Sequence, residues 1–488
     1  MEKPESPWIS PRAKDKFLIG IPSRKHLAIL DAPRPMRRCS SKISPVKFSP
    51  IKMKPLPENP MTHVRWRMII MVMALCFISH LNRSSMSVAG TDQIMQRYGI
   101  NPVQMGGVYS SFLLVYSICM IPGGVFIDRF GPRRALMLVG FGSAVFAALT
   151  GILGWIGLAG GSLWIGLILA RGAMGCISSP LHPAGARAVA HWFPAGQRSW
   201  ANGIVTAAAI AGVAASYPGF GALIARVGWS TGFVICAGVT ATITIIWSLN
   251  STDTPSSHPQ VNATERAWIE SGVVSVTKNL GDEIGWRDLI CNRSLLLVTL
   301  SYSAVGYFQY LFVYWMQYYF DKVLNLGGAT SKYYAGFLQV ALAIGMPLGG
   351  WISAHWSSKL GVRRGRSLVA GGGMAASAIL LGLGVICRDP VWIVVWFALA
   401  HTALGASEGP IWATAVDIGR SKGGTAAAIC NTGGNVGGLL APVVTPWVGG
   451  ILGWSWGISL GGAICLLGAF CWFGIHPDAE VKRRTASN

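Results

Sequence analysis

Long apolar runs alternate with short polar segments along most of this chain. Roughly twelve runs of about 18 or more apolar residues can be distinguished, and each is long enough to cross a bilayer as an α-helix. In the first part of the chain they lie near 66–90, 103–127, 135–158, 163–190, 201–225 and 231–249. In the second part they lie near 295–320, 334–355, 368–386, 391–416, 425–449 and 452–473. The pattern predicts an all-α membrane protein with twelve transmembrane helices.

The segments without apolar runs divide the chain. We expect an N-terminal extension, a six-helix bundle, a cytoplasmic linker, a second six-helix bundle and a cytoplasmic tail, at 1–60, 61–250, 251–292, 293–475 and 476–488. The extension is rich in Pro, Ser, Lys and Arg, which predicts disorder. It could be an organelle transit peptide, a mis-assigned start before Met61, or a basic tail attracted to anionic lipid. Within the linker, a short amphipathic surface helix is expected near 263–274.

Composition supports the membrane assignment. Hydrophobic residues make up 52% of the chain, charged residues only 12%, and the mean hydropathy is +0.46. The net charge of +21 does not indicate nucleic-acid binding, because the cations gather in the loops on one side of a twelve-helix arrangement. This bias predicts that both termini are cytoplasmic. The ten cysteines are scattered without a CxxC motif, which indicates reduced packing residues and no metal site.

The segment GGVFIDRFGPRR, from Gly123 to Arg134, joins two of the apolar runs. A loop of cytoplasmic cations would explain its arginines but not the glycine pair one turn before the acid. We interpret the segment as a charge-paired hinge, with Asp128 bound to Arg187 or Arg198. The residues of this gating motif are Gly124, Asp128, Arg129, Gly131, Arg133 and Arg134.

The second half repeats the segment as GGWISAHWSSKLGVRRGR, from Gly349 to Arg366. Such a repeat is typical of a transporter built from two packed halves. The position of the acid is taken by Ala354, so we expect this hinge to lack its carboxylate and to hold its half less firmly.

Two arginines, Arg83 and Arg171, lie inside apolar runs without an acid nearby in their own helices. A charge at mid-bilayer costs at least about 2.5–3.5 kcal/mol, so each must line a cavity, form a salt bridge or extend to the interface. If neither has a protein partner, the missing anion is the substrate. A guanidinium offers a planar fork that suits a carboxylate.

Several segments resemble the anion:cation symporter family of the major facilitator superfamily, which includes bacterial hexuronate, galactonate and glucarate transporters and animal sialic-acid and vesicular glutamate carriers. The resemblance spans about 62–475 and is carried by the GGVFIDRFG loop, SSFLLVYSICMIPGG, YLFVYWMQYYF and GGTAAAICNTGGNVGGLLAPVV. It implies the major facilitator fold, with two pseudo-symmetric six-helix bundles. It also implies that Arg83, Tyr116, Arg171 and Asn431 face a central substrate cavity. Asn435, four residues further along the same helix face, is a second candidate, although both amides could instead join helices.

The acids that the family uses for proton coupling are replaced here by Asn82 and Ser178. One acid remains deep in a run, Glu408, and superposing the two halves at a constant offset pairs it with Ser178. His401 lies two turns before it and pairs with Arg171. Glu408 and His401 are therefore candidates for proton coupling. Alternatively, Glu408 caps backbone groups at the Gly409–Pro410 break or hydrogen-bonds a neighbouring side chain.

These features predict a monomeric secondary transporter of a small organic anion, most simply a sugar acid, in the cell (inner) membrane. Proton symport is favoured, and uniport, anion exchange or a non-transporting nutrient sensor of the same fold are the alternatives. No nucleotide-binding loop, zinc site or nucleophile triad is recognisable. We therefore expect no cofactor, no nucleic-acid partner and no enzymatic activity.

Overall fold

The computed structural model describes residues 60–158, 160–194, 197–271, 289–419 and 422–476, and these contain helices but no strand. The predicted N-terminal extension and C-terminal tail lie almost entirely outside the described residues. The first half contains α1 (Val64–Ala89), η1 (Gly90–Ile94), α2 (Met95–Tyr98), α3 (Pro102–Trp155), α4 (Gly160–Ser178), α5 (Leu181–Trp192), α6 (Arg198–Ala215), η3 (Ser216–Phe220) and α7 (Gly221–Asn250). Between the halves lie η4 (Pro255–Ser257) and α8 (Ala263–Ser271). The second half contains α10 (Arg293–Tyr318), η5 (Tyr319–Val323), α11 (Gly328–Leu360), α12 (Val362–Ile386), α13 (Pro390–Gly419), α14 (Gly423–Leu452), α15 (Trp454–Phe470) and η7 (Cys471–Phe473).

The described residues form ten continuous apolar helical stretches, two of which are long enough to cross a membrane twice. Both long stretches break at a glycine with positive φ, at Gly131 (φ 81°) and at Gly228 (φ 77°). A side chain would be strained in that conformation, whereas glycine adopts it freely. Splitting the stretches there gives twelve spans, in agreement with the sequence pattern. The predicted run at 163–190 is interrupted after Ser178, where α4 gives way to α5.

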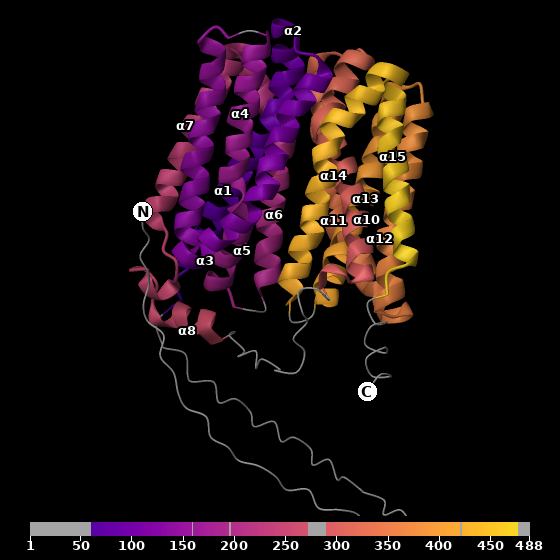
Figure 1. The fold of residues 1–488 in the computed structure, drawn as a ribbon. Coiled ribbons are helices and arrows are strands. Elements are labelled where there is room, and N and C mark those ends of the chain that lie inside the picture. The colour runs from indigo at the N-terminus through magenta and orange to yellow at the C-terminus, as the bar shows by residue number, and fades with distance from the viewer. Residues whose placement is uncertain (1–59, 159, 195–196, 272–288, 420–421, 477–488) are drawn as a thin grey trace, which may run out of the picture. The chain divides into compact units, whose positions relative to one another are not determined.

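The helices form two bundles, with the indigo to magenta helices of the first half on one side and the orange to yellow helices of the second half on the other (Figure 1). We call the end of the bundles that carries Val64 and Phe473 the terminal end, and the opposite end the far end. The fold is the predicted one, two packed six-helix bundles. The domain bounds expected from the sequence stay a prediction.

Several hydrogen bonds join the two halves toward the far end. The carboxylate of Asp92, in η1, accepts hydrogen bonds from Lys332 Nζ at 2.8 Å and Gln317 Nε2 at 2.7 Å, both in the second half. The Tyr217 hydroxyl donates to the Val313 carbonyl at 2.6 Å, and the Ser110 hydroxyl to the Leu439 carbonyl at 2.7 Å. This polar network holds the two halves together at the far end.

The predicted helix of the linker is α8, and it contacts the start of α1 at the terminal end. Glu265 of α8 is fully buried and forms an ion pair with Arg65 at 3.2 Å. The same carboxylate accepts hydrogen bonds from the backbone N–H groups of Val64 and Arg65. These groups belong to the first turn of α1, whose N–H groups lack partners within the helix. Glu265 therefore fixes the start of α1.

Candidate functional site

Arg171 is a buried cation at the centre of the first bundle. Its side chain is on α4, and the residue is only 1% exposed. One terminal nitrogen donates to the Arg83 carbonyl at 2.7 Å, and the other to the Asn82 carbonyl at 3.2 Å and the Met174 sulfur at 3.2 Å. Its Nε has no hydrogen-bond partner, and among the described residues no carboxylate forms an ion pair with it. The hydrogen bonds orient the guanidinium but leave its charge without a counterion.

Arg83, on α1, is surrounded by aromatic rings that belong to both halves of the protein. Its Cζ is 4.8 Å from the ring centroid of Phe112, 4.9 Å from Tyr310 and 5.9 Å from Tyr116. One terminal nitrogen donates to the Tyr310 hydroxyl. Ring faces attract cations, but they do not neutralise them. Like Arg171, Arg83 forms no ion pair within the described part of the chain.

The ring of Phe112 brings the two arginines together. It lies 4.8 Å from Arg83 Cζ and 5.5 Å from Arg171 Cζ, and it stacks against the ring of Tyr116 with centroids 5.9 Å apart. The sequence therefore named three residues that do meet, Arg83, Tyr116 and Arg171. It did not single out Phe112, which lies within a continuous apolar run.

Tyrosines of both halves extend this group of rings. Tyr310 and Tyr314 of α10 stack with centroids 5.9 Å apart, and Tyr314 stacks against Tyr109 of α3 at 4.6 Å. The Tyr109 hydroxyl is buried without a hydrogen-bond partner. In the sequence, Tyr307, Tyr310 and Tyr314 recur on one side of this helix, a pattern that is more often packing than a surface for binding sugars. The regular spacing of these tyrosines was nevertheless the feature of the sequence that could have identified Tyr310 as a site residue, since Tyr310 contacts Arg83.

Asn431 and Asn435, on α14, point toward one residue of the opposite half. Their Nδ2 atoms lie 3.8 Å and 3.6 Å from the sulfur of Met120 on α3. The two amides thus share a helix face, as their spacing predicts. A thioether is a weak hydrogen-bond acceptor, so these contacts satisfy the amides poorly.

Glu408, on α13, is 7% exposed. Its Oε2 accepts hydrogen bonds from the Tyr302 hydroxyl and the Trp412 indole N–H, both at 3.1 Å. No hydrogen bond to the backbone at Gly409–Pro410 is seen, so of the two structural roles considered above, bonding to neighbouring side chains is the one observed. The carboxylate has no cationic partner within the described residues.

His401 lies in a separate environment from Glu408. It is fully buried, its Nδ1 lies 2.8 Å from the Leu338 carbonyl, and its ring centroid lies 4.4 Å from that of Phe312. Its Nε2 has no hydrogen-bond partner. A direct proton transfer between His401 and Glu408 therefore has no hydrogen bond to follow in this conformation. No cluster of three or more metal-ligating side chains occurs among the residues described.

Comparison with known proteins identifies the family. The family model described as Major Facilitator Superfamily matches residues 72–428, well over half of the chain. The chain belongs to the Major Facilitator Superfamily. A protein of Bacillus subtilis named probable galactarate/D-glucarate transporter is 27% identical over 432 residues, which cover 85% of this chain and 90% of the relative. A probable sulfoacetate transporter of Cupriavidus necator is 28% identical, with 77% and 86% covered, and a D-galactonate transporter of Escherichia coli is 25% identical, with 85% and 96% covered.

Solved structures agree on the fold. A bacterial homologue of the human lysosomal transporter Spinster, in an inward-facing and unoccupied conformation, superposes with a TM-score of 0.69 at 14% sequence identity. The match covers 85% of this chain and 98% of that one. The predicted resemblance to the superfamily is therefore confirmed by sequence and by structure.

The hinge of the first half contains the predicted ion pair. Arg187 donates from its guanidinium to the Asp128 carboxylate. Arg198, the other candidate partner, donates instead to the Phe193 carbonyl. Gly123 packs closely against the break between α4 and α5, because a Cβ on it would lie 2.8 Å from the Ser179 hydroxyl. A Cβ on Gly124 would meet no atom within 4 Å. Close helix packing thus requires Gly123, not the Gly124 of the predicted motif.

The loop of this hinge is fixed by an acid that the sequence did not single out. The Asp253 carboxylate accepts a hydrogen bond from the Arg133 backbone N–H at 2.9 Å. It lies where a side chain on Gly131 would be, 2.6 Å from the position of a Cβ. Two further arginines point elsewhere: Arg129 lies against the Phe130 ring, and Arg134 is exposed.

The expectation that the hinge of the second half lacks a carboxylate is wrong. Ala354 cannot pair, but Arg366 forms an ion pair with Asp417 at 2.6 Å. Asp417 lies 230 positions after Arg187, the offset that also separates Arg171 from His401. Asp417 therefore corresponds to Arg187, whereas Arg366 corresponds at the same offset to Leu136, which follows the loop. The second half thus has an ion pair at its hinge, but only one of its two positions matches the pair of the first half. Motif matching missed this because the acid lies outside the loop.

We expect the Arg366–Asp417 pair to tune transport rate and not folding. Asp417 is exposed and Arg366 partly so, and an ion pair near the surface contributes about 0.2–1 kcal/mol. Asp417→Arg should therefore slow uptake about two- to fivefold in proteoliposomes. Exchanging the charges in an Arg366→Asp/Asp417→Arg double variant should restore the rate. The same exchange at Asp128 and Arg187 provides a matched comparison in the first half. A double variant as slow as the single one would show that the pair has no mechanical role.

Proposed function

We propose that this chain is a secondary transporter that carries a sugar acid, such as a hexuronate, an aldonate or an aldarate, by alternating access and in symport with protons. The observation that carries the proposal is the pair of cations at Phe112. Arg83 and Arg171 both lie against the ring of Phe112, and neither has a carboxylate partner among the described residues. A charge in a membrane protein interior needs an anion, and a transported anion supplies it when it binds.

The substrate class follows from chemistry that the relatives share. Galactarate, D-glucarate, D-galactonate and sulfoacetate, the compounds in the relatives' names, are all small organic anions. Three of the four also carry several hydroxyl groups. Both halves of the protein supply polar groups that could form hydrogen bonds with these hydroxyls. The amides of Asn431 and Asn435 and the unpartnered hydroxyl of Tyr109 are placed in the two halves. We propose that the arginines bind a carboxylate of the substrate and that these groups, with Tyr116, bind its sugar chain.

We assign binding of the co-transported proton to Glu408, with His401 as a second candidate. Burial disfavours an ionised carboxylate, so Glu408 can gain and lose a proton as the water around it changes with each conformation. Tyr302 and Trp412 both donate to one oxygen of Glu408, and these bonds stabilise the ionised form. Uniport or anion exchange is the alternative, because Asn82 and Ser178 cannot bind protons.

We place the transporter in the cell (inner) membrane as a monomer, with the terminal end of the bundles in the cytoplasm. The cationic loops of that end support this orientation by the positive-inside rule. The far-end contacts, such as Asp92 with Lys332, then close the outer side. Together with the hinge of the first half, they determine which side of the membrane the central site faces.

Transport assays on the purified protein test the proposal. Proteoliposomes should take up labelled D-glucarate and D-galactonate, and accumulate them when the outside is more acidic. Galactitol, which has the hydroxyls but no carboxylate, should not compete, whereas sulfoacetate measures how far the site accepts other anions. Binding of these acids without uptake would indicate a nutrient sensor. Neither binding nor uptake of any organic anion would contradict the proposal.

A further inference from the structure

A surface groove on the second half lies away from the candidate site. It runs between α12 and α15, has a volume of about 680 Å³ and is within the size range of ligand pockets, about 300–1,000 Å³. None of the arginines, tyrosines or amides of the candidate site lines it. Three of its lining residues, Leu368, Phe470 and Phe473, are 48%, 58% and 79% exposed, so the groove faces the surroundings of the bundle.

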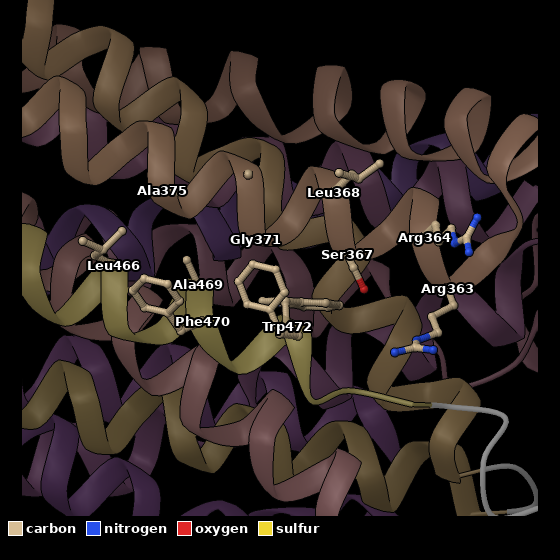
Figure 2. A pocket seen from close by; sticks show the side chains of 12 residues that line it. Arg363, Arg364, Ser367, Leu368, Gly371, Ala375, Leu466, Ala469, Phe470 and Trp472 are labelled. Atoms are coloured by element: carbon tan, nitrogen blue, oxygen red, sulfur yellow. The ribbon is translucent and has the colours of Figure 1, made fainter.

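The groove is amphipathic along its length. Figure 2 shows Arg363 and Arg364 at one end, while Leu466, Phe470 and Trp472 line the remainder. No Asp or Glu is among the lining residues. The cationic end is the terminal end of α12, where the helix begins. The exposed ring of Phe473 also lines the groove. The ligand that fits has an anionic head and an apolar chain.

Among the residues that the structure describes, no carboxylate pairs with the arginines at this end of the groove, in contrast to comparable arginines. Arg366 is paired with Asp417, and in the first half Asp253 places a carboxylate against the loop at Arg133. Within the described residues, Arg363 donates to the Ile475 carbonyl at 3.2 Å and lies 2.5 Å from His476 Nε2, and it forms no ion pair. Arg364 is exposed, and no ion pair involves it within the described residues.

We propose that this groove binds an anionic phospholipid of the surrounding membrane, with the phosphate against Arg363 and Arg364 and one acyl chain between α12 and α15. A protein partner would need a larger surface, and a soluble anion would leave the apolar walls exposed. Basic pockets between transmembrane helices at the cytoplasmic side are suited to such headgroups. The lipid would hold α12, which begins at the hinge loop of the second half, against α15.

Lipid titration with native mass spectrometry tests the site. We expect the wild-type protein in detergent to retain phosphatidylglycerol in preference to phosphatidylcholine. Arg364→Gln should weaken retention of phosphatidylglycerol by on the order of fivefold, and Arg363→Gln/Arg364→Gln by on the order of tenfold or more. Retention of phosphatidylcholine should not change in either variant. Excess inorganic phosphate should not displace the lipid, because the acyl chain contributes to binding.

Two further variants separate the groove from general surface charge. A Cβ on Gly372 would meet no atom within 4 Å, so Gly372→Leu fits the fold and fills the groove without changing the charge. It should lower phosphatidylglycerol retention as strongly as the double arginine variant. Arg134→Gln removes another exposed cation, at the corresponding position of the first half, and should have little effect. Equal retention of the two lipids, an unchanged Gly372→Leu variant, or an equal loss in Arg134→Gln would overturn the proposal.

Discussion

Replacing Arg171 with glutamine is expected to abolish uptake of sugar acids while the protein remains folded and inserted. A hydrogen bond to a charged group contributes about 1.5–3 kcal/mol, so losing a two-pronged contact should weaken binding about 100-fold or more. Arg83→Gln should have an effect of the same order, because both cations adjoin the ring of Phe112. Initial uptake rates in proteoliposomes, measured over a range of substrate concentrations, give the change in KM and kcat.

Two kinds of variant separate substrate binding from folding. Arg171 donates to the carbonyls of Asn82 and Arg83, so its loss could also loosen α4 from α1. Arg171→Lys keeps the charge without the planar fork and should recover stability but only a small part of the uptake. Arg226→Gln removes an exposed cation elsewhere and should transport normally. Wild-type uptake in both Arg83→Gln and Arg171→Gln would eliminate the anion site.

Glu408→Gln is expected to abolish accumulation driven by a pH gradient but to retain substrate counterflow. Glutamine keeps an oxygen that can accept from Tyr302 and Trp412, but it cannot bind and release a proton. Exchange of labelled for unlabelled substrate needs no net proton movement, so it should continue. The two assays on one preparation of proteoliposomes therefore separate coupling from translocation.

The control for this variant is Glu270→Gln, since Glu270 lies exposed on α8 and, among the described residues, forms an ion pair with Arg266 of the same helix. It should accumulate substrate like the wild type. Accumulation that still follows the pH gradient in Glu408→Gln would exclude Glu408 as the coupling group. If the wild type itself fails to accumulate against a gradient, uniport or exchange is the correct description of this transporter.

The fold could largely be predicted from the sequence, because a transmembrane helix is a local property. A run of about 20 apolar residues has few other ways to satisfy its backbone in lipid. The break at Gly131 was also local, since a glycine between charged residues marks the turn. The arginines were recognisable because a charge is costly in the membrane wherever the fold places it.

The rest of the site consists of contacts between residues that are far apart in the chain. A single sequence without an alignment does not show which of these residues are in contact. Tyr310 meets Arg83 although 227 positions separate them, and Tyr302 meets Glu408 across 106. Asp417 escaped notice because the repeat was compared loop by loop, while its ion pair joins two different helices. The repeat thus predicted where charged residues gather, but not which helix carries the acid and which carries the arginine.

A structure determined with D-glucarate bound tests the central claim most directly. We predict that a carboxylate of the ligand lies within hydrogen-bond distance, about 2.7–3.2 Å, of a terminal nitrogen of Arg83 or Arg171. Its hydroxyls should lie toward Asn431 and Asn435. A ligand bound elsewhere, with both guanidinium groups still in contact only with the protein, would contradict the account.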